Sequence, residues 1–505
     1  MWCVTVKHIL IDTRLFQGKG WGLSMISDIE LTKDGPIYLQ IRDYIKQMIL
    51  KGFMSRGQKL PSTRDLSQTL GVSRNTIILA YEYLEDEGFI EIVRGKGSFV
   101  SDINIDYPSL WKMDWNPRLT PYASLAVDLD IVKHEPKWKK GMISFKSIAP
   151  DDKLFDVEDF KRAFLNRFSL EGEKLLNYGY AQGYKPLIDY LLNYMQNKGV
   201  DIQDKSILIT NGFTEGFNII LTSLSKPGDY ILCENPTHNT ALKIMKLYEQ
   251  KIVGIPMDED GINLEELEKG LREKPISMGF LIPSYHNPTG IVMSPDKRAK
   301  VLKTFAKHRI PIIEDGFNEE LRYSGSHMSP LAALCGSGNS IIYIGSLSKV
   351  LFPGLRIGWI LADKELISQL VSVKRSRDIH TSFLDQALLY EYLAAGNLDR
   401  YLKKARREYR EKYDFAINCA NMYIPSKRIL GEGGLHIFVE LAEKIDARQV
   451  LEECIKRNVI FMPGDIFYTD GKGLNTLRLG FARSSLQEIE KGFKIIGKVV
   501  EKFII

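Results

Sequence analysis

Short apolar runs that alternate with segments of helical period dominate the sequence from residue 205 onwards. The runs lie at 207–209, 230–232, 252–255, 279–282, 310–313, 341–344 and 357–361. Buried strands separated by helices are typical of a mostly parallel sheet that helices cover on both faces. The sequence therefore predicts an α/β domain. Three later runs, at 435–441, 459–462 and 477–481, predict a smaller α+β lobe after it.

The chain of 505 residues is too long for one ordinary core, so it should divide into at least two domains. Hydrophobic residues make up 44% and charged residues 26%, the balance of a soluble globular protein. No apolar run is long enough to cross a bilayer, and the first residues lack the pattern of a secretory signal. The five cysteines are scattered without the spacing of metal ligands, which favours reduced thiols and no metal site. We therefore expect a cytoplasmic protein without a membrane partner.

Residues 31–101 carry the pattern of a winged helix-turn-helix. Apolar residues at helical spacing predict a first helix, and a second helix begins after Ser62, with Asp65 as its capping-box partner. After a short glycine turn, Ser73 is placed to cap a third helix. Two alternating segments within 89–100 predict a β-hairpin with a basic tip, which would be the wing.

The net charge of +5 neither requires nor excludes a nucleic-acid partner. The position of the charges along the chain decides whether we expect one. In a helix-turn-helix, the first residues of the second helix of the pair reach bases and phosphates in the major groove. Arginine can bond guanine and asparagine adenine, while hydroxyl groups and a helix N-terminus favour phosphate. The candidate DNA contacts are Arg64, Ser73, Arg74, Asn75, Thr76 and Lys96.

A helical hairpin with charged faces is also common in proteins that never touch DNA, so the order of the motifs decides between the two interpretations. The segments at 36–38, 60–64, 71–76, 87–88 and 95–100 resemble the GntR-type bacterial DNA-binding domain along its whole length. The resemblance implies a winged helix that binds operator DNA as a dimer. The DNA contacts that it implies are Arg64, Ser73, Arg74, Thr76 and Lys96.

Segments with little helical or strand periodicity flank this domain and mark its expected boundaries. Residues 1–30 are expected to be a flexible extension, and Met25 is an alternative start. Residues 102–140 contain four prolines and three tryptophans without a sustained period, so we expect a linker that docks through its aromatic residues. The large domain then occupies 141–505.

The segment 345–359 contains a single lysine, Lys349, directly after a predicted strand. Open α/β sheets bind ligands at the carboxyl ends of their strands. A lysine amine there can condense with an aldehyde to form a Schiff base, and burial beside a cation lowers its pKa enough to make it nucleophilic. The neighbouring Ser346, Ser348 and Arg356 would form a phosphate cup. The segment resembles the lysine motif of fold type I pyridoxal phosphate enzymes of the aspartate aminotransferase kind, although alone it could also hold a surface lysine.

The other strand ends supply the remaining groups that this cofactor needs. Gly212, Phe213 and Thr214 follow a strand and open a helix, so their amides and the Thr214 hydroxyl can hold a phosphate. The resemblance places Asp315 opposite the pyridine nitrogen, where a carboxylate keeps the ring protonated as an electron sink. Taken singly, an aspartate at this position would more often cap a helix than bind a cofactor.

Four further residues take their roles from the resemblance to aminotransferases. Asn287 stands in an Asn-Pro-Thr-Gly motif whose asparagine bonds the phenolic oxygen of pyridoxal 5'-phosphate, and His238 falls where an aromatic ring stacks on the cofactor. Tyr178 belongs to a segment that reaches the phosphate across a dimer interface. Arg478 matches the strand arginine that binds a substrate carboxylate bidentately.

One position departs from the pattern. Phe317 stands where similar proteins usually have a tyrosine that hydrogen-bonds the cofactor oxygen. Without that hydroxyl, Asn287 is left as the main donor to the oxygen. We expect cofactor binding to survive and transamination to suffer, which favours a regulator over an enzyme.

A GntR-like reader ahead of an aminotransferase-like body resembles the MocR/GabR-type transcriptional regulators over residues 31–505. The resemblance implies a head-to-tail homodimer in the bacterial cytoplasm that joins the nucleoid when it binds operator DNA. It implies pyridoxal phosphate held as a lysine aldimine at Lys349, which senses an amine or amino acid effector or the vitamer itself. Two alternatives stay open: a working aminotransferase with an accessory helix-turn-helix, and a DNA-binding repressor whose large domain only dimerises.

Overall fold

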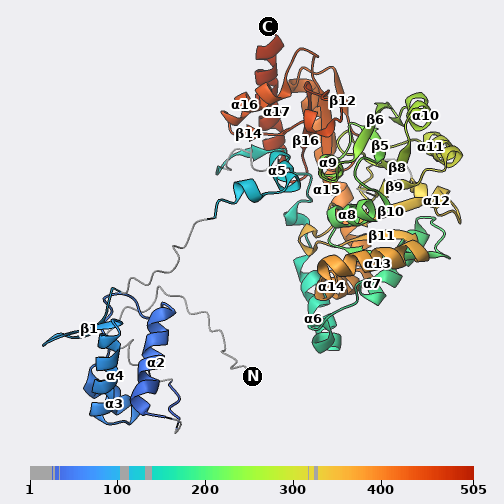
Figure 1. The fold of residues 1–505 in the computed structure, drawn as a ribbon. Coiled ribbons are helices and arrows are strands. Elements are labelled where there is room, and N and C mark those ends of the chain that lie inside the picture. Colours follow the sequence, from blue (N-terminus) through green and yellow to red (C-terminus); the bar gives the residue numbers. More distant parts are fainter. Residues whose placement is uncertain are drawn as a thin grey trace. The chain divides into compact units, whose positions relative to one another are not determined.

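The computed structural model describes residue 26 and residues 29–32, 35–102, 113–130, 139–316, 318–323 and 328–504. The chain divides into two compact units, Met1–Pro117 and Arg118–Ile505, which are shown in Figure 1. The division falls inside the segment 102–140. Each unit has its own hydrophobic core.

The smaller unit contains three helices followed by a β-hairpin. These elements are α2 (Ile37–Leu50), α3 (Thr63–Leu70), α4 (Arg74–Asp86), β1 (Ile90–Val93) and β2 (Gly97–Val100). The strands β1 and β2 pair antiparallel. The core between the helices includes Ile41, Ile45, Leu66, Ile77 and Leu84, all fully buried. This arrangement confirms the predicted winged helix-turn-helix.

Side-chain caps fix where α3 and α4 begin. The Ser62 hydroxyl accepts a hydrogen bond from the amide of Asp65 at 3.2 Å, as the N-cap prediction requires, while the Asp65 carboxylate accepts from that hydroxyl at 2.6 Å in place of the Ser62 amide of a full capping box. The Ser73 hydroxyl accepts from the amide of Thr76 at 3.1 Å. Between the two helices, Gly71 has a φ of 65°, a conformation that glycine adopts without strain. The starts of the two helices and the turn between them are therefore encoded by neighbouring residues.

The larger unit is built on a sheet of eight strands in the order β4-β11-β10-β9-β8-β5-β6-β7. The strands are β4 (Lys205–Thr210), β5 (Tyr230–Asn235), β6 (Lys251–Asp258), β7 (Gly261–Ile262), β8 (Ile276–Leu281), β9 (Ile312–Asp315), β10 (Ile341–Ser346) and β11 (Gly358–Asp363). The strand β11 runs antiparallel to both its neighbours and β7 antiparallel to β6, while the other pairs are parallel. All seven runs predicted as strands from 205 onwards are confirmed.

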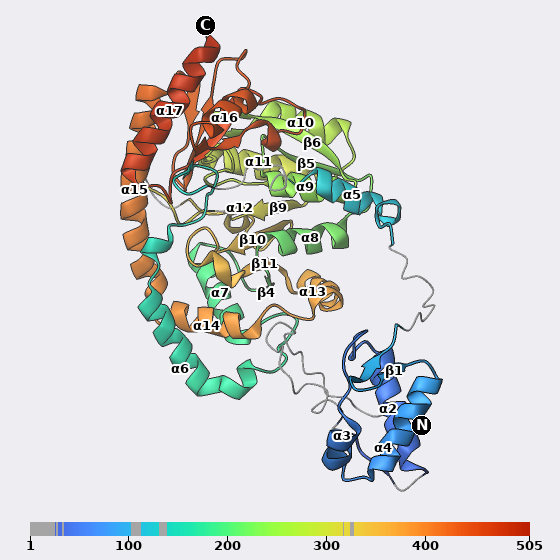
Figure 2. The same ribbon diagram turned by 90° about the vertical axis from the view of Figure 1, so that its left-hand side faces the viewer.

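Helices cover both faces of this sheet. They include α7 (Lys185–Asn197), α8 (Phe213–Leu224), α9 (Asn239–Leu247), α10 (Leu264–Glu273), α11 (Pro295–His308), α12 (Leu331–Leu334), α13 (Lys364–Asp378) and α14 (Phe383–Ala394). In Figure 2, α8 and α13 lie on one side of the sheet, and α7 and α12 lie on the other. The strands are consequently buried on both faces, which explains their continuous apolar sequence.

A smaller lobe follows, as the late apolar runs predict. Its antiparallel sheet has the order β12-β13-β16-β15, and a separate pair joins β14 to β3 in parallel. The strands are β3 (Ile143–Ser144), β12 (Arg428–Leu430), β13 (His436–Glu440), β14 (Val459–Ile460), β15 (Met462–Pro463) and β16 (Thr476–Gly480). The helices of this region are α15 (Asn397–Tyr423), α16 (Ala447–Ile455) and α17 (Leu486–Ile504), whereas α6 (Val157–Leu175) packs against α14. Figure 2 shows α15 and α17 side by side along one flank of the unit.

The described part of the expected linker contains a helix that the sequence pattern does not predict. This helix, α5 (Pro121–Asp128), is capped by the hydroxyl of Thr120. It packs against α9, and the ring of Tyr122 lies 6.2 Å from that of Tyr248. Eight residues are too few to show a helical period, so the tertiary contact is needed to stabilise it. Among the described helices of the chain, none is long and apolar enough to cross a membrane.

Candidate functional site

Five predicted residues meet at one edge of the large sheet. Asp315 ends β9, Lys349 follows β10, and Gly212, His238 and Asn287 follow β4, β5 and β8. The strands β5, β8, β9 and β10 are parallel neighbours, and β4 has the same direction because it pairs antiparallel with β11. Their carboxyl ends therefore lie at the same edge, where α/β sheets bind ligands.

The amine of Lys349 lies in an environment that disfavours its charge. Burial, together with the positive charges of Arg478, Arg356 and Arg483, lowers its pKa to about 8. Asp315 acts in the opposite direction. A substantial fraction of the amine is thus unprotonated slightly above neutral pH, as a nucleophile requires.

Asp315 is a buried carboxylate without a charged hydrogen-bond partner in the described part of the chain. Burial raises its pKa well above the usual range, and the nearby carboxylates of Glu319 and Glu234 add to the effect. The nearest ring nitrogen, Nδ1 of His238, is 3.8 Å away. Burial lowers the pKa of His238 to about 3, so this imidazole is neutral and forms no ion pair with Asp315. A protonated ring nitrogen from a ligand would supply the missing cation.

Backbone amides and polar side chains surround the start of α8. Gly212 has a φ of 84°, and a Cβ atom there would lie 2.9 Å from Nη2 of Arg356. The same Nη2 donates a hydrogen bond to the carbonyl of Asn211 at 3.1 Å. Ser346 and Ser348 are joined by a hydroxyl–hydroxyl hydrogen bond of 3.0 Å. Together they form a positively charged cradle at a helix N-terminus, which suits a phosphate.

The two residues after Gly212 differ in exposure. The ring of Phe213 stacks on Phe217 at 5.3 Å and lies 5.0 Å from the ring of His238. Its side chain is therefore used in packing, which leaves the amide at the helix start as the group that a ligand could reach. Thr214 is exposed in the first turn of α8, where its hydroxyl can act as a donor.

A buried ionic network supports the cradle, and sequence reasoning missed it. The Lys374 amine, fully buried, lies 2.8 Å from carboxylate oxygens of both Glu215 and Asp378. Asp378 accepts a hydrogen bond of 2.8 Å from the side chain of Asn211, and Glu215 accepts one from the Asn211 amide. The i,i+4 spacing of Lys374 and Asp378 was visible in the sequence. Their link to a turn on β4 depends on the tertiary fold.

The strand β16 places Arg478 beside the turn that holds Asn287. The Nη1 group of Arg478 donates a hydrogen bond of 2.7 Å to the side-chain oxygen of Asn287, and Nη2 donates one of 3.1 Å to the carbonyl of Lys146. Its Nε has no hydrogen-bond partner among the described residues. Burial lowers the pKa of Arg478 to about 9. A carboxylate ligand would satisfy the free Nε and offset the cost of burial.

One predicted position among the described residues is not part of this cluster. Tyr178 is 79% exposed, and its ring lies edge-on to that of His380 at 6.1 Å. A residue that serves the site of a second chain would have such an exposed position. Phe317 lies outside the described residues.

In the smaller unit, the predicted DNA contacts gather at the start of α3, the start of α4 and the hairpin. Arg64, Arg74, Asn75 and Lys96 are exposed. Nε of Arg74 donates to the hydroxyl of Thr63 at 3.3 Å, which links the starts of α4 and α3. The other two predicted contacts, Ser73 and Thr76, share a hydroxyl–hydroxyl hydrogen bond of 2.8 Å within the helix cap.

Comparisons with known proteins agree with this division. Residues 142–496 match the aminotransferase class I and II family, and residues 37–100 match the bacterial regulatory proteins of the gntR family. The HTH-type transcriptional regulator YisV of Bacillus subtilis is 29% identical, over 93% of this chain and 97% of its own length. Aromatic-amino-acid aminotransferase 1 of Thermococcus litoralis is 31% identical, over 72% of this chain and 88% of its own length.

Solved structures resemble the larger unit. The crystal structure of LysN, an alpha-aminoadipate aminotransferase from Thermus thermophilus complexed with N-(5'-phosphopyridoxyl)-L-leucine, has a TM-score of 0.71 and 28% identity. The similarity covers 78% of this chain and 99% of LysN. The larger unit thus has the fold of the type I aminotransferases.

Proposed function

The chain belongs to the aminotransferase class I and II family, with a gntR-type DNA-binding domain ahead of that region, and from this premise we propose a sensing function. The protein is a DNA-binding transcriptional regulator of the MocR/GabR type. Its larger unit binds pyridoxal phosphate through the amine of Lys349. The bound vitamer, or an amine or amino acid that reacts with it, is the signal.

One observation carries this proposal: an amine of lowered pKa, a buried carboxylate and an arginine cradle lie together at one sheet edge. The pKa of Lys349 is lowered to about 8 by burial and by neighbouring arginines, and that of Asp315 is raised by burial and neighbouring carboxylates. The space at Gly212 beside Arg356 admits no Cβ atom without a close contact. Nδ1 of His238 is buried without a hydrogen-bond partner among the described residues. These features fit a phosphorylated pyridine aldehyde.

Each part of the cofactor has residues that would hold it. Arg356, Ser346 and Ser348, with the amides and the hydroxyl at the start of α8, would hold the phosphate. Asp315 would hold the ring nitrogen, Asn287 the phenolic oxygen and His238 the ring face. Bound there, pyridoxal phosphate supplies an aldehyde that reacts with amines.

The chain's own residues would convert binding into a signal. A carboxylate on the effector would bind Arg478, whose hydrogen bond to Asn287 joins the smaller lobe to the turn after β8. Binding can shift the protein between DNA-binding states only if the effector has different affinities for them. The Arg478–Asn287 link is where we expect that difference to arise.

A second copy of the chain is the expected partner of the large unit. The segment from α6 to Tyr180 exposes large apolar side chains, with Leu170 70%, Leu176 71% and Tyr180 75% exposed. Apolar surface of this kind marks an interaction site. A head-to-tail homodimer would cover it and bring Tyr178 to the partner's cofactor. Such a dimer also presents two DNA-binding units to a two-part operator in the bacterial cytoplasm, where the protein would join the nucleoid.

In the DNA-binding unit, the start of α4 would enter the major groove. Arg74 and Asn75 would reach base edges, and Arg64 and Lys96 would contact the backbone. Ser73 and Thr76 would orient the helix end toward a phosphate.

Titration of the purified chain with pyridoxal phosphate tests the cofactor claim. We expect a visible absorbance band that saturates at one cofactor per chain and is absent in Lys349→Ala. The control Lys404→Ala removes an exposed lysine on α15 and should keep the band. Borohydride reduction followed by peptide mass spectrometry should place the cofactor on Lys349. A colourless protein in excess vitamer would reject the proposal.

A working aminotransferase is the second candidate, favoured by the free Nε of the buried Arg478. Its test is turnover: repeated conversion of an amino acid to a keto acid, measured with the full chain, would support it. The departure at Phe317 leads us to expect a single conversion at most.

A further inference from the structure

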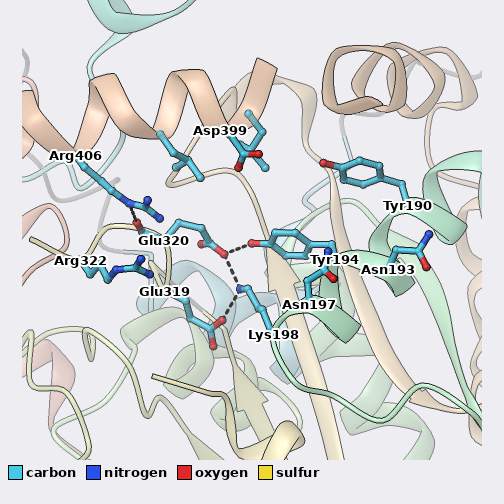
Figure 3. A pocket seen from close by; sticks show the side chains of 12 residues that line it. Tyr190, Asn193, Tyr194, Asn197, Lys198, Glu319, Glu320, Arg322, Asp399 and Arg406 are labelled. Atoms are coloured by element: carbon cyan, nitrogen blue, oxygen red, sulfur yellow. Dashed lines mark hydrogen bonds and ion pairs between the residues drawn. The ribbon is translucent and has the colours of Figure 1, made fainter. Parts of the chain in front are cut away.

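A cavity of about 460 Å³ lies behind the segment that carries Asp315, between α7 and the first half of α15. Figure 3 shows its charged lining, with Arg322 and Arg406 on one side and Tyr190 and Asn193 on the other. Arg322 and Arg406 also border a second cavity of about 560 Å³. None of the residues that line these two cavities belongs to the cofactor cluster.

Two of the three carboxylates that line the first cavity have partners. Burial raises the pKa of Tyr190, and the third carboxylate, Asp399, lies close enough to raise it further. The Lys198 amine lies 2.6 Å from oxygens of both Glu319 and Glu320. The Tyr194 hydroxyl donates a further hydrogen bond to Glu320, as Figure 3 shows. All three charges are almost fully buried, with side-chain exposures of 9% or less. The carboxylates of this cluster are thus engaged by Lys198 and Tyr194, and Glu320 offsets only part of the effect of burial and of Arg322 on the pKa of Arg406.

The two arginines, in contrast, lack anionic partners in the described part of the chain. Nε of Arg406 donates a hydrogen bond of 2.6 Å to the backbone carbonyl of Glu320, and its other nitrogens make no hydrogen bond to the described residues. No side-chain hydrogen bond or ion pair of Arg322 occurs within the same ranges. Burial lowers the pKa of Arg406, and the neighbouring charge of Arg322 lowers it further. Two positive charges thus lie side by side, and they repel each other. An anion bound between them would remove this unfavourable energy.

The second cavity increases the positive charge. Its lining contains four arginines against two carboxylates, because Arg407 and Arg410 lie there with Glu411 and Asp414. The backbone of Arg322 is fixed by an antiparallel bridge to Gly433, and the guanidinium of Arg406 is oriented by the Glu320 carbonyl. A guanidinium group that is oriented in advance, as that of Arg406 is, binds planar or tetrahedral oxyanions at a low entropic cost.

We propose that Arg322 and Arg406 form a binding site for a small oxyanion, a phosphate or a carboxylate, on the wall between these two cavities. The site is separate from the cofactor site but lies on the same chain segment as Asp315. Glu319, in that segment, accepts a hydrogen bond of 3.1 Å from Tyr343 on β10 and is one of the charges that raise the pKa of Asp315. An anion bound here would therefore lie next to the chain segment that carries Asp315, on the side away from the cofactor site.

Calorimetric titration of the full chain at low ionic strength tests the site, with inorganic phosphate in one arm and succinate in the other. We expect saturable binding in at least one arm, and the tighter arm identifies the ligand chemistry. Arg322→Gln and Arg406→Gln should each weaken it at least tenfold, whereas Arg375→Gln, an exposed arginine on α13, should not. Arg356→Gln removes the expected cofactor cradle and should keep this binding, which separates the two sites. Binding that is unchanged in Arg322→Gln and Arg406→Gln, or wholly lost in Arg356→Gln, would overturn the proposal.

Thermal melting distinguishes a binding role from a structural one. Because Arg322 has no partner to lose among the described residues, Arg322→Gln should melt at or above the temperature of the unchanged chain in buffer without phosphate. In the Arg356→Gln background, which lacks the cofactor's phosphate cradle, a saturating ligand should raise the melting temperature by mass action, and the added Arg322→Gln change should abolish that rise. A variant that melts several degrees lower without ligand would mean that Arg322 serves the fold instead.

Discussion

Arg478 on β16 donates a 2.7 Å hydrogen bond to the side-chain oxygen of Asn287, so the smaller lobe is bonded directly to the turn after β8. The sequence assigns the two residues to different ligands, Arg478 to an effector carboxylate and Asn287 to a cofactor oxygen. In the structure they hold each other. A ligand that engages either residue must therefore act on the other, which provides a route from effector binding to lobe position.

Removal of this hydrogen bond should weaken the fold of the larger unit. Asn287→Ala leaves a buried guanidinium short of one acceptor, and hydrogen bonds to charged groups contribute roughly 1.5–3 kcal/mol. We expect the free energy of unfolding to fall by about 2 kcal/mol, measured from the urea transition of this unit. Asn218→Ala, on the outer part of α8, is the control. Equal stability of Asn287→Ala and the unchanged chain would show that the bond contributes nothing.

Attachment of pyridoxal phosphate should depend on pH through the Lys349 amine. Its pKa is lowered to about 8 from an ordinary value of 10.5. The amine is protonated and unreactive below that value, so the attachment rate should rise with pH and level off above pH 8. Stopped-flow absorbance measures the rate. Arg483→Gln removes one of the charges that lower this pKa, so its midpoint should move upward. A midpoint near 10.5 in the unchanged chain would contradict the buried site.

Loss of Lys374 should be among the most damaging single changes. Its side chain is fully buried between Glu215 and Asp378, and without it two carboxylates are left uncompensated. Lys374→Met should cost about 3–5 kcal/mol of unfolding free energy. A triple variant that adds Glu215→Gln and Asp378→Asn should recover most of that loss in urea unfolding. A loss below about 1 kcal/mol in Lys374→Met would refute the network's role.

Salt dependence should reveal which arginines of the smaller unit contact DNA. Arg74→Ala removes an exposed charge at the start of α4, so operator affinity should fall by at least about tenfold. The slope of log affinity against log salt should also decrease by about 1 if Arg74 contacts a phosphate. The matched control is Arg42→Ala, because Arg42 pairs with Glu87 at the other end of α4. Equal losses in the two variants would indicate that Arg74 has no special place in the complex.

Much of the fold was predictable because its signals are local. The hydroxyl of Ser62 and the carboxylate of Asp65 are three residues apart, and the isoleucine runs carry their strand propensity in their own side chains. The proximity of Gly212, Asp315 and Lys349 followed from one rule, since each lies at or shortly after the carboxyl end of a strand, and these strands run in the same direction.

The remaining features depend on contacts between distant segments. The pairing of β3 with β14 joins residues near 143 to residues near 459 without any local pattern. The contact of Tyr122 with Tyr248 stabilises a helix too short to show a period. The hydrogen bond from Arg478 to Asn287 requires the smaller lobe to be in place. The role expected from Phe317 stays a prediction, because that residue lies outside the described ranges.

The proposed regulator requires that the state of the Lys349 site changes DNA binding. The most direct measurement is the affinity of the full chain for an operator fragment selected from its host's DNA, at fixed salt, with and without pyridoxal phosphate and candidate amino compounds. We predict that one of these ligands changes the affinity at least about fivefold and that Lys349→Ala abolishes the change. The same affinity under every condition would contradict the sensing function.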